Sequence, residues 1–334
     1  MKIGFFELEG WEETRLRERF TGHELRFSND KISGTELPPQ TDFDAISVFV
    51  NSEITAGLLA RFPNLKYIAT RSTGYDHIDI AACNARGIKV GFVPGYGDNT
   101  VAEFAFGLML NLTRKMYRAI DQVKESDSFS LTGLRGIDIK GKTLGVLGTG
   151  RIGKEAITIA NGFGMKVVAY DPYPNPEAAK ALGFSYAPIE EVLGNADIVT
   201  IHCPLTAETR HLINKDTIRF MKRGSYLINT ARGGIVETAA LVAALMDGTL
   251  AGAGLDVLEE EGDVHDEMKL MGAKELHEEK LRVLLQNHSL IHMANVLITP
   301  HTAFNTQEAL ERILNTAIES MAAFIAGSPT NLIS

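Results

Sequence analysis

The stretch Gly148-Thr149-Gly150-Arg151-Ile152-Gly153 decides the fold of one half of this chain. It directly follows an apolar run, Thr143–Leu147, and it opens a helical pattern over Arg151–Gly164. A second apolar run, Lys166–Tyr170, then ends at Asp171. This order of strand, glycine loop, helix, strand and acid is the fingerprint of a dinucleotide-binding βαβ unit.

Each part of the fingerprint has a physical role. Gly148 permits the tight turn, Gly150 lets the backbone approach the pyrophosphate, and Gly153 lets the helix pack close to the strand. Arg151 and Ile152 begin the helix, whose free N–H groups and positive dipole end face the phosphates. The glycine pattern alone also fits an ordinary βα turn, and the strand, helix and acid around it favour the cofactor.

The acid after the second strand indicates which dinucleotide is bound. Asp171 lies 23 residues after Gly148 and can accept hydrogen bonds from both ribose hydroxyls. Its charge would repel a 2′-phosphate, and the following Pro172-Tyr173-Pro174 has no arginine to neutralise one. We therefore expect NAD rather than NADP as the cofactor.

Length and composition predict a two-domain globular protein. The chain has 334 residues, more than the roughly 250–300 at which a single core stops growing. It is 45% apolar and 22% charged, which is ordinary for a soluble protein. The net charge of −9 argues against binding nucleic acid or an anionic membrane surface. No apolar stretch reaches the roughly 18–20 residues of a membrane span, so we expect a soluble protein.

The chain start and the cysteines both fit a cytoplasmic protein. The start at Met1–Phe6 resembles a first strand rather than a signal peptide, because acidic residues follow it closely. Cys83 and Cys203 lie far apart in apolar surroundings. We expect both to be free core thiols in a reducing compartment.

Apolar runs alternate with helical patterns nearly from end to end, which predicts an α/β protein with parallel sheets. In the first part we expect strands at Lys2–Phe6, Ala45–Val50, Tyr67–Arg71 and Val90–Val93. Helices are expected between them at Ala56–Arg61 and Ile78–Ala85. A long helical stretch is predicted over Asn99–Ser126. In the second part the fingerprint is followed by strands at Ile198–His202, Tyr226–Thr230, Ala253–Val257 and Val296–Thr299, with a helix at Ala239–Met246.

The position of the fingerprint predicts how the domains are arranged. It begins near residue 143, so we expect an NAD-binding domain over residues 102–299, inserted into a substrate domain formed by residues 1–101 and 300–334. Both domains would be Rossmann-like, the first flavodoxin-like and the second dinucleotide-binding. The last helix, Thr306–Ile325, could pack on either domain.

An enzyme that reduces a carbonyl with a nicotinamide cofactor needs a cation for the substrate's charge and a proton donor for its oxygen. Arg232 follows a predicted strand, where a guanidinium can bind a carboxylate through paired hydrogen bonds. His301 follows another strand, and histidine can give or take a proton near neutral pH. A surface arginine and a structural histidine are the alternatives for the two residues taken singly.

Acidic residues follow a third late strand. Asp256, at the strand end, could accept a hydrogen bond from the nicotinamide ribose or carboxamide. The run Glu259-Glu260-Glu261 comes next, and a run of this kind is usually a solvated face. All three segments lie where open α/β sheets bind ligands, at the carboxyl ends of strands.

These segments resemble the signature blocks of the D-isomer-specific 2-hydroxyacid dehydrogenases, and they are most similar to the D-lactate branch. The resemblance covers nearly the whole chain. It implies that Arg232 binds the carboxylate of a 2-oxo acid, and that Glu261 and His301 pair as the acid/base unit. The implied activity is the reversible NADH-linked reduction of a small 2-oxo acid such as pyruvate. Phenylpyruvate, 2-oxobutyrate, glyoxylate and hydroxypyruvate stay open as substrates.

The resemblance also implies binding roles for other residues. The backbone N–H groups of Thr73 and Gly74 would hold the substrate carboxylate, and Tyr96 and Phe304 would line a compact pocket. Closure of a cleft between the domains would exclude water. The long helix would contribute to a homodimer interface. Further cofactor contacts are implied beside the adenine and near the nicotinamide, at Cys203, Pro204, Thr209, Thr230 and Ala231.

The stretch 262–294 is longer than in the shorter branches of the family, and we expect a polar loop with a helix near Glu275–Leu285. It holds four of the nine histidines. His288 and His292 have the spacing of a metal-binding pair on a helix, but no tight second pair accompanies them, so we expect no metal.

A binding protein is the alternative from another class. The NAD-sensing corepressors related to these enzymes have the same fold and the same Arg, Glu and His. Such scaffolds usually add long disordered tails, whereas Ser334 lies seven residues past Gly327. The sequence therefore favours the enzyme.

Overall fold

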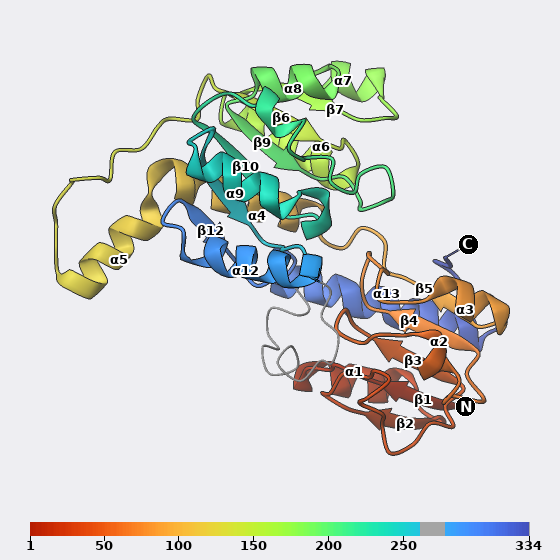
Figure 1. Ribbon diagram of the computed structural model, residues 1–334. Helices are drawn as coiled ribbons and strands as arrows, with labels where there is room; N and C mark the ends of the chain where they lie inside the picture. The colour runs from red at the N-terminus through yellow and green to blue at the C-terminus, as the bar shows by residue number, and fades with distance from the viewer. Residues whose placement is uncertain (261–277, 334) are drawn as a thin grey trace. The chain divides into compact units, whose positions relative to one another are not determined.

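The computed structural model describes residues 1–260 and 278–333, apart from the side chain of Glu279. The chain divides into two compact units, one formed by Met1–Tyr96 with Asn305–Ser334 and the other by Gly97–Phe304 (Figure 1). Residues 97–101 and 300–304, which the sequence analysis assigned to the substrate domain, group with the second unit. None of the helices among the described residues is long and apolar enough to cross a membrane.

The first unit contains a five-stranded parallel sheet in the order β2-β1-β3-β4-β5. This is the flavodoxin-like strand order that the sequence predicted. In chain order the strands are β1 Lys2–Phe5, β2 Glu24–Phe27, β3 Ala45–Val48, β4 Tyr67–Thr70 and β5 Lys89–Gly91.

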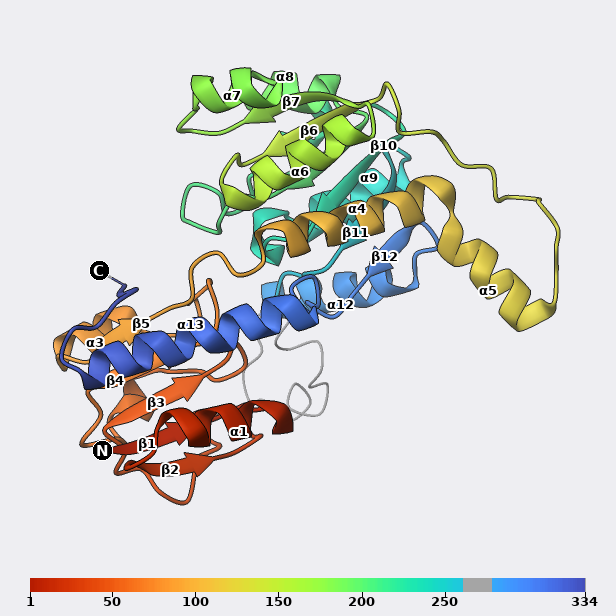
Figure 2. The same ribbon diagram turned by 180° about the vertical axis from the view of Figure 1, so that it is seen from behind.

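Helices cover both faces of this sheet because alternate strand residues point to opposite sides. Ile3 and Phe5 pack in one apolar cluster with residues of α1 (Gly10–Arg19) and α13 (Gln307–Ile325). Figure 2 shows these two helices on one side of the sheet. The ring of Tyr67 on β4 stacks on that of Phe324 on α13, with centroids 4.4 Å apart. The last helix therefore packs on the first unit. The opposite face carries α2 Ala56–Leu59 and α3 Ile80–Ala85.

The second unit contains a seven-stranded parallel sheet in the order β12-β11-β10-β9-β6-β7-β8. The chain runs outward from β6 in one direction and then restarts at β9 in the other. The junction of β6 and β9 is therefore the switch point at which such sheets bind dinucleotides. The strands are β6 Thr143–Leu147, β7 Lys166–Tyr170, β8 Ser185–Tyr186, β9 Ile198–Ile201, β10 Ser225–Asn229, β11 Leu250–Leu255 and β12 Val296–Ile298.

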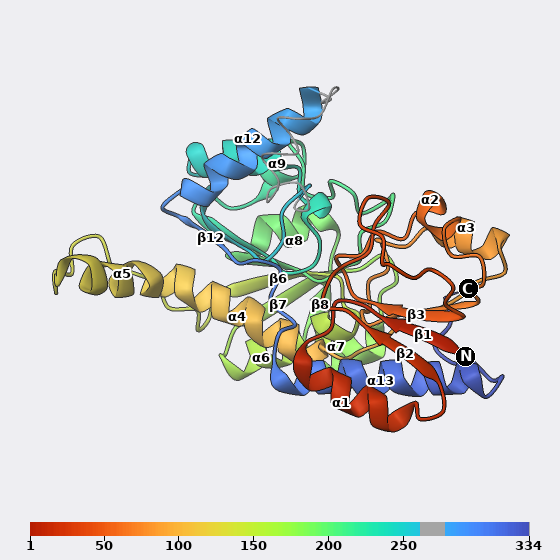
Figure 3. The ribbon, with the colours of Figure 1, turned by 90° about the horizontal axis from the view of Figure 1, so that it is seen from below.

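Helices also cover both faces of the second sheet, as Figure 3 shows. Strands covered on both faces are apolar throughout rather than alternating, and all four residues of β9 are buried. One face carries α4 Asp98–Arg114, α6 Arg151–Gly162 and α7 Pro176–Leu182. The other carries α8 Ile189–Asn195, α9 Thr238–Met246 and α12 Glu278–His292.

The helical stretch predicted over Asn99–Ser126 consists of two helices. Helix α4 ends at Arg114, and α5 (Met116–Ser126) begins after Lys115, which has a left-handed φ of 51°. The N–H of Ile137 donates to the Thr113 carbonyl, at 2.9 Å, which a continuous helix would use for its own ladder. The returning chain thus replaces a helical hydrogen bond, and no glycine or proline in the sequence marks the break.

Candidate cofactor site and candidate active site

The glycine loop between β6 and α6 has the geometry that its sequence predicts. Gly148 has a φ of 94°, and a Cβ added there would lie 2.6 Å from the backbone N of Cys203 in the loop after β9. A Cβ on Gly153 would lie 2.0 Å from the Gly148 carbonyl oxygen. Both positions therefore require glycine, one for its conformation and for close approach, the other for close packing.

Gly150 differs from the other two glycines. A Cβ added there would meet no heavy atom within 4 Å, so protein packing does not require glycine at this position. Gly150 is also the N-cap of α6, and no side chain caps the helix there. Uncapped N–H groups at the start of a helix form a binding site for phosphate, so the loop fits the pyrophosphate of NAD.

Asp171, at the end of β7, is held over the glycine loop. Its Oδ2 accepts hydrogen bonds from the backbone N of Thr149, at 2.7 Å, and from the Thr149 hydroxyl, at 2.9 Å. Its Oδ1 accepts from the backbone N of Tyr173 at 2.9 Å. The carboxylate is thereby fixed beside the phosphate-binding turn, where a ribose is expected. Arg151 at the start of α6 pairs with Asp98, with Nε and Oδ2 2.7 Å apart.

Replacing Asp171 with asparagine is expected to weaken the preference for NADH over NADPH by at least about tenfold, since one unit charge facing a phosphate is worth more than 1.4 kcal/mol at partly solvated sites. Asparagine keeps an oxygen for the Thr149 hydrogen bonds and removes only the charge. The measurement is kcat/KM with each cofactor. The argument fails if the unmodified protein already uses both equally well.

Arg232 lies in the turn after β10, and a buried amide shapes that turn. The Asn229 side chain, 1% exposed, accepts from the backbone N of Ala231 at 3.0 Å and donates to the Arg232 carbonyl at 2.9 Å. The guanidinium donates to the Ala231 carbonyl at 2.8 Å. Arg232 is partly exposed, and a guanidinium carries five N–H donors in a geometry that suits a carboxylate.

His301 lies in the loop after β12 and has a left-handed φ of 51°. Its backbone N donates to the carbonyls of Asp256, at 2.9 Å, and Thr299, at 3.0 Å. The Asp256 carboxylate accepts from the Thr299 hydroxyl at 2.5 Å and from the backbone N of Thr302 and Ala303 at 2.9 and 2.8 Å. Asp256 therefore holds the loop that presents His301.

Asp256 is buried, and its described hydrogen-bond partners are protein groups. Its side chain is 1% exposed, and burial raises the pKa of the carboxyl while the Thr299, Ala303 and Thr302 hydrogen bonds lower it. The described donors all belong to the His301 loop. A contact between Asp256 and the nicotinamide half of the cofactor stays a prediction.

The two candidate catalytic residues that the structure describes in the second unit, Arg232 and His301, lie at one edge of its sheet. Strands β10, β11 and β12 are parallel neighbours, so their carboxyl ends lie at the same edge. Arg232 follows β10 and His301 follows β12. Glu261, expected after β11, lies outside the described residues.

The loop after β9 contributes further candidate cofactor contacts. Burial raises the pKa of the Cys203 thiol to about 11 and lowers that of the neighbouring His202 to about 4, so both are neutral near pH 7. The Thr209 hydroxyl donates to the Pro204 carbonyl at 2.6 Å, which closes the loop. The Thr230 hydroxyl, at the end of β10, is buried and has no hydrogen-bond partner among the described residues. Rotation of its side chain toward a bound cofactor would satisfy it, which also fits NAD.

The expected substrate residues of the first unit lie in the loops after β4 and β5. The Thr73 hydroxyl donates to the Val93 carbonyl at 2.6 Å, and the Ser72 hydroxyl donates to that of Gly74 at 2.6 Å. The Tyr96 carbonyl accepts from Arg312 Nε on α13 at 2.7 Å. Phe304, in the second unit, is partly buried. Carboxylate binding by Thr73 and Gly74 stays a prediction.

A run such as Glu259-Glu260-Glu261 is usually a solvated face, but Glu259 does not follow this pattern. Its side chain is 7% exposed, whereas the next residue, Glu260, is exposed and pairs with Lys280 at 3.6 Å. The burial of Glu259 could not be predicted from the run of charges, because it depends on partners from other segments of the chain. Both cysteines, Cys83 and Cys203, are free and buried, as expected.

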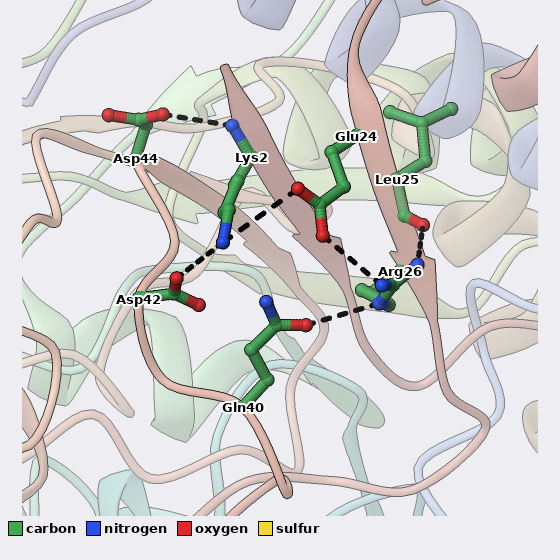
Figure 4. Close-up of polar contacts among 7 residues, drawn as sticks. All are labelled: Lys2, Glu24, Leu25, Arg26, Gln40, Asp42 and Asp44. Atoms are coloured by element: carbon green, nitrogen blue, oxygen red, sulfur yellow. Dashed lines mark hydrogen bonds and ion pairs between the residues drawn. The ribbon is translucent and has the colours of Figure 1, made fainter.

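A cavity of about 780 Å³ lies wholly in the first unit, beneath the connection from β2 to β3. It is lined by a mixture of apolar residues such as Phe6 and Phe43 and polar or charged residues such as Arg26, Asp30 and Gln40, and by none of the candidate catalytic residues. Figure 4 shows the polar contacts beside it, where Arg26 Nε donates to Gln40 Oε1 at 3.1 Å.

The histidine pair considered for metal binding lies on α12. The rings of His288 and His292 touch edge to face, with centroids 4.6 Å apart. Within residues 1–260 and 278–333, no three His, Cys, Asp or Glu side chains are grouped so that they could hold a metal ion. His265 and His277 lie outside the described residues.

Comparison with known proteins identifies the family. Residues 106–303 match the family described as D-isomer specific 2-hydroxyacid dehydrogenase, NAD binding domain. The D-lactate dehydrogenase of Escherichia coli K12 is 34% identical over 339 residues that span 100% of both chains. The aromatic 2-oxoacid reductase of Clostridium sporogenes is 36% identical over 309 residues, which cover 91% of this chain and 89% of the relative.

A solved structure gives the same result at the level of the fold. The D-lactate dehydrogenase of Aquifex aeolicus, complexed with NAD and lactic acid, superposes with a TM-score of 0.86 and 35% identity over 98% of this chain and 96% of that one. The predicted fold class and the predicted cofactor, NAD, are thereby confirmed. The chain belongs to the D-isomer-specific 2-hydroxyacid dehydrogenases, a family of NAD-dependent oxidoreductases.

Proposed function

We propose that this protein reduces pyruvate to D-lactate with NADH, and catalyses the reverse reaction. The observation that carries the proposal is the position of Arg232 and His301 at one edge of one sheet, after β10 and β12, with β11 between these strands and with the glycine loop in the same unit. The full-length match to a D-lactate dehydrogenase and the likeness to one complexed with lactic acid support this substrate.

In this proposal each residue has a defined role. The Arg232 guanidinium donates two hydrogen bonds to the substrate carboxylate, and the backbone N–H groups of Thr73 and Gly74 bind the same group. The glycine loop and Asp171 would hold NADH, and the bound cofactor would be the source of a hydride for C2. His301 donates its proton to the carbonyl oxygen, and Glu261 keeps His301 protonated.

Aromatic 2-oxo acids are the second candidate substrates. The Clostridium sporogenes relative, named for these substrates, is 36% identical to this chain. Tyr96 and Phe304 would have to leave space for a second aromatic ring to admit phenylpyruvate. We place pyruvate first because a D-lactate dehydrogenase matches the whole length of this chain.

The test is a steady-state assay with NADH and a panel of pyruvate, 2-oxobutyrate, phenylpyruvate, glyoxylate and hydroxypyruvate. We expect the largest kcat/KM with pyruvate. A higher kcat/KM with phenylpyruvate would show that the preferred substrate is an aromatic 2-oxo acid, while the proposed reaction type would still hold. NADH binding without turnover of any 2-oxo acid would contradict the enzyme and favour the NAD-sensing scaffold.

We also propose that the protein is a cytoplasmic homodimer. Met116, Ile120 and Val123 lie on one face of α5 and are 38–48% exposed. Phe129 and Leu131, just after this helix, are 83% and 84% exposed. Apolar side chains gathered in this way are typical of a protein interface, and two free thiols suit a reducing compartment.

A further inference from the structure

The carboxylate of Glu259 is buried where three segments of the second unit meet. Its Oε1 lies 2.7 Å from His211 Nε2 and 3.6 Å from Arg210 Nη2. Its Oε2 accepts from the Thr238 hydroxyl at 2.8 Å and from the Thr238 backbone N at 3.3 Å. A buried carboxylate is costly unless it is paired and hydrogen-bonded, and here both oxygens have partners.

This carboxylate also supplies a helix cap. Helix α9 begins at Thr238, and its own N-cap residue, Glu237, makes no capping hydrogen bond. Glu259, from a different strand connection, accepts the Thr238 N–H instead. A negative charge is favourable at the N-terminus of a helix, so Glu259 fixes the chain that leads from Arg232 into α9.

The turn that carries Arg232 packs directly on the backbone beside Glu259. A Cβ on Gly233 would lie 2.0 Å from the carbonyl carbon of Leu258 and 2.3 Å from the backbone N of Glu259. On the other side, the backbone N of His211 donates to the Gly234 carbonyl at 2.9 Å. The Arg232 turn is therefore enclosed by the segment that contains His211 and by the segment that contains Leu258 and Glu259. The Glu259 carboxylate links these two segments through its contact with the His211 side chain.

We propose that Glu259 is a positioning residue for Arg232, an inference that rests on the proposed role of Arg232 in binding the substrate carboxylate. Glu259 joins the 210–211 segment, the start of α9 and its own segment around the Arg232 turn. Without it, His211 and the start of α9 lose their shared partner and the turn is free to shift. A shift of about 1 Å in a binding group costs about a hundredfold in rate.

The experiment compares Glu259→Ala, Glu259→Gln and the control Glu260→Ala, which removes the adjacent exposed carboxylate. We expect Glu259→Ala to lower kcat/KM for pyruvate about a hundredfold, with KM raised. Glutamine can still accept from Thr238 and should recover about tenfold of that loss. The Glu260 control should stay within about twofold. Thermal unfolding shows that each variant is folded at the assay temperature.

A second comparison separates positioning from general stabilisation. In an Arg232→Ala background, adding Glu259→Ala should lower kcat/KM by less than about threefold, because the effects of residues that act together are not additive. Binding of oxamate, an unreactive mimic of a 2-oxo acid, to the NADH complex should weaken in both single variants.

Three results would overturn the inference. They are an unchanged kcat/KM in Glu259→Ala, an equal further loss in the Arg232→Ala background, and a loss confined to NADH affinity. If Arg232→Ala itself leaves turnover and oxamate binding intact, the proposed function fails first, and the inference with it.

Discussion

Replacing Arg232 with alanine is expected to lower kcat/KM for the 2-oxo acid by about a thousandfold or more, since two hydrogen bonds between charged groups are lost at about 1.5–3 kcal/mol each. The loss should appear in both KM and kcat, because the guanidinium would bind the carboxylate and orient the neighbouring carbonyl. NADH affinity should change little. Steady-state kinetics and NADH fluorescence titration measure the two effects.

Two further variants make this test specific. Arg232→Lys keeps the charge but not the planar pair of donors, so its kcat/KM should lie between that of the alanine variant and that of the unmodified protein. Arg219→Ala removes an exposed arginine whose guanidinium lies 5.4 Å from the Phe220 ring, and it should leave kinetics unchanged. A kcat/KM for Arg232→Ala within about tenfold of the unmodified protein would remove Arg232 from the substrate site.

Replacing His301 with alanine is expected to lower kcat by about a hundred- to ten-thousandfold, the usual contribution of a general acid. The variant loses the group that would protonate the carbonyl oxygen, whereas the glycine loop and Asp171 are untouched. Turnover should therefore collapse while the NADH dissociation constant stays close to its original value. Single-turnover measurements at saturating pyruvate report the chemical step directly.

The pH dependence of the same variant provides an independent readout. Reduction requires a protonated donor, so the unmodified protein should lose kcat/KM as the pH rises. That decline should disappear in His301→Ala. His292→Ala, which removes an exposed histidine on α12, is the matched control and should behave as the unmodified protein. Near-normal turnover in His301→Ala would refute the proposed role.

Much of the fold was predictable because its signals are local. A strand covered on both faces is a continuous apolar run, so β6, β7 and β9 could be found from composition alone. The short strand β2 was missed because its residues alternate between exposed and half-buried. The break at Lys115 was missed because no glycine or proline marks it, and because the hydrogen bond from Ile137 to the Thr113 carbonyl joins residues far apart along the chain.

By itself, the sequence determined the strand, glycine turn, helix and acid of the cofactor unit, because each depends on neighbours within one βαβ segment. Gly153 is required by its contact with Gly148 within that segment, and Gly148 by its positive φ, although its close contact with Cys203 comes from the loop after β9. Only the tertiary structure decided that Arg232 and His301 share one sheet edge, and that Asp256 and Glu259 are buried and bonded to other segments. The burial and the hydrogen-bond partners of these carboxylates arise from packing between residues far apart along the chain, so they cannot be predicted from a run of acidic residues in the sequence.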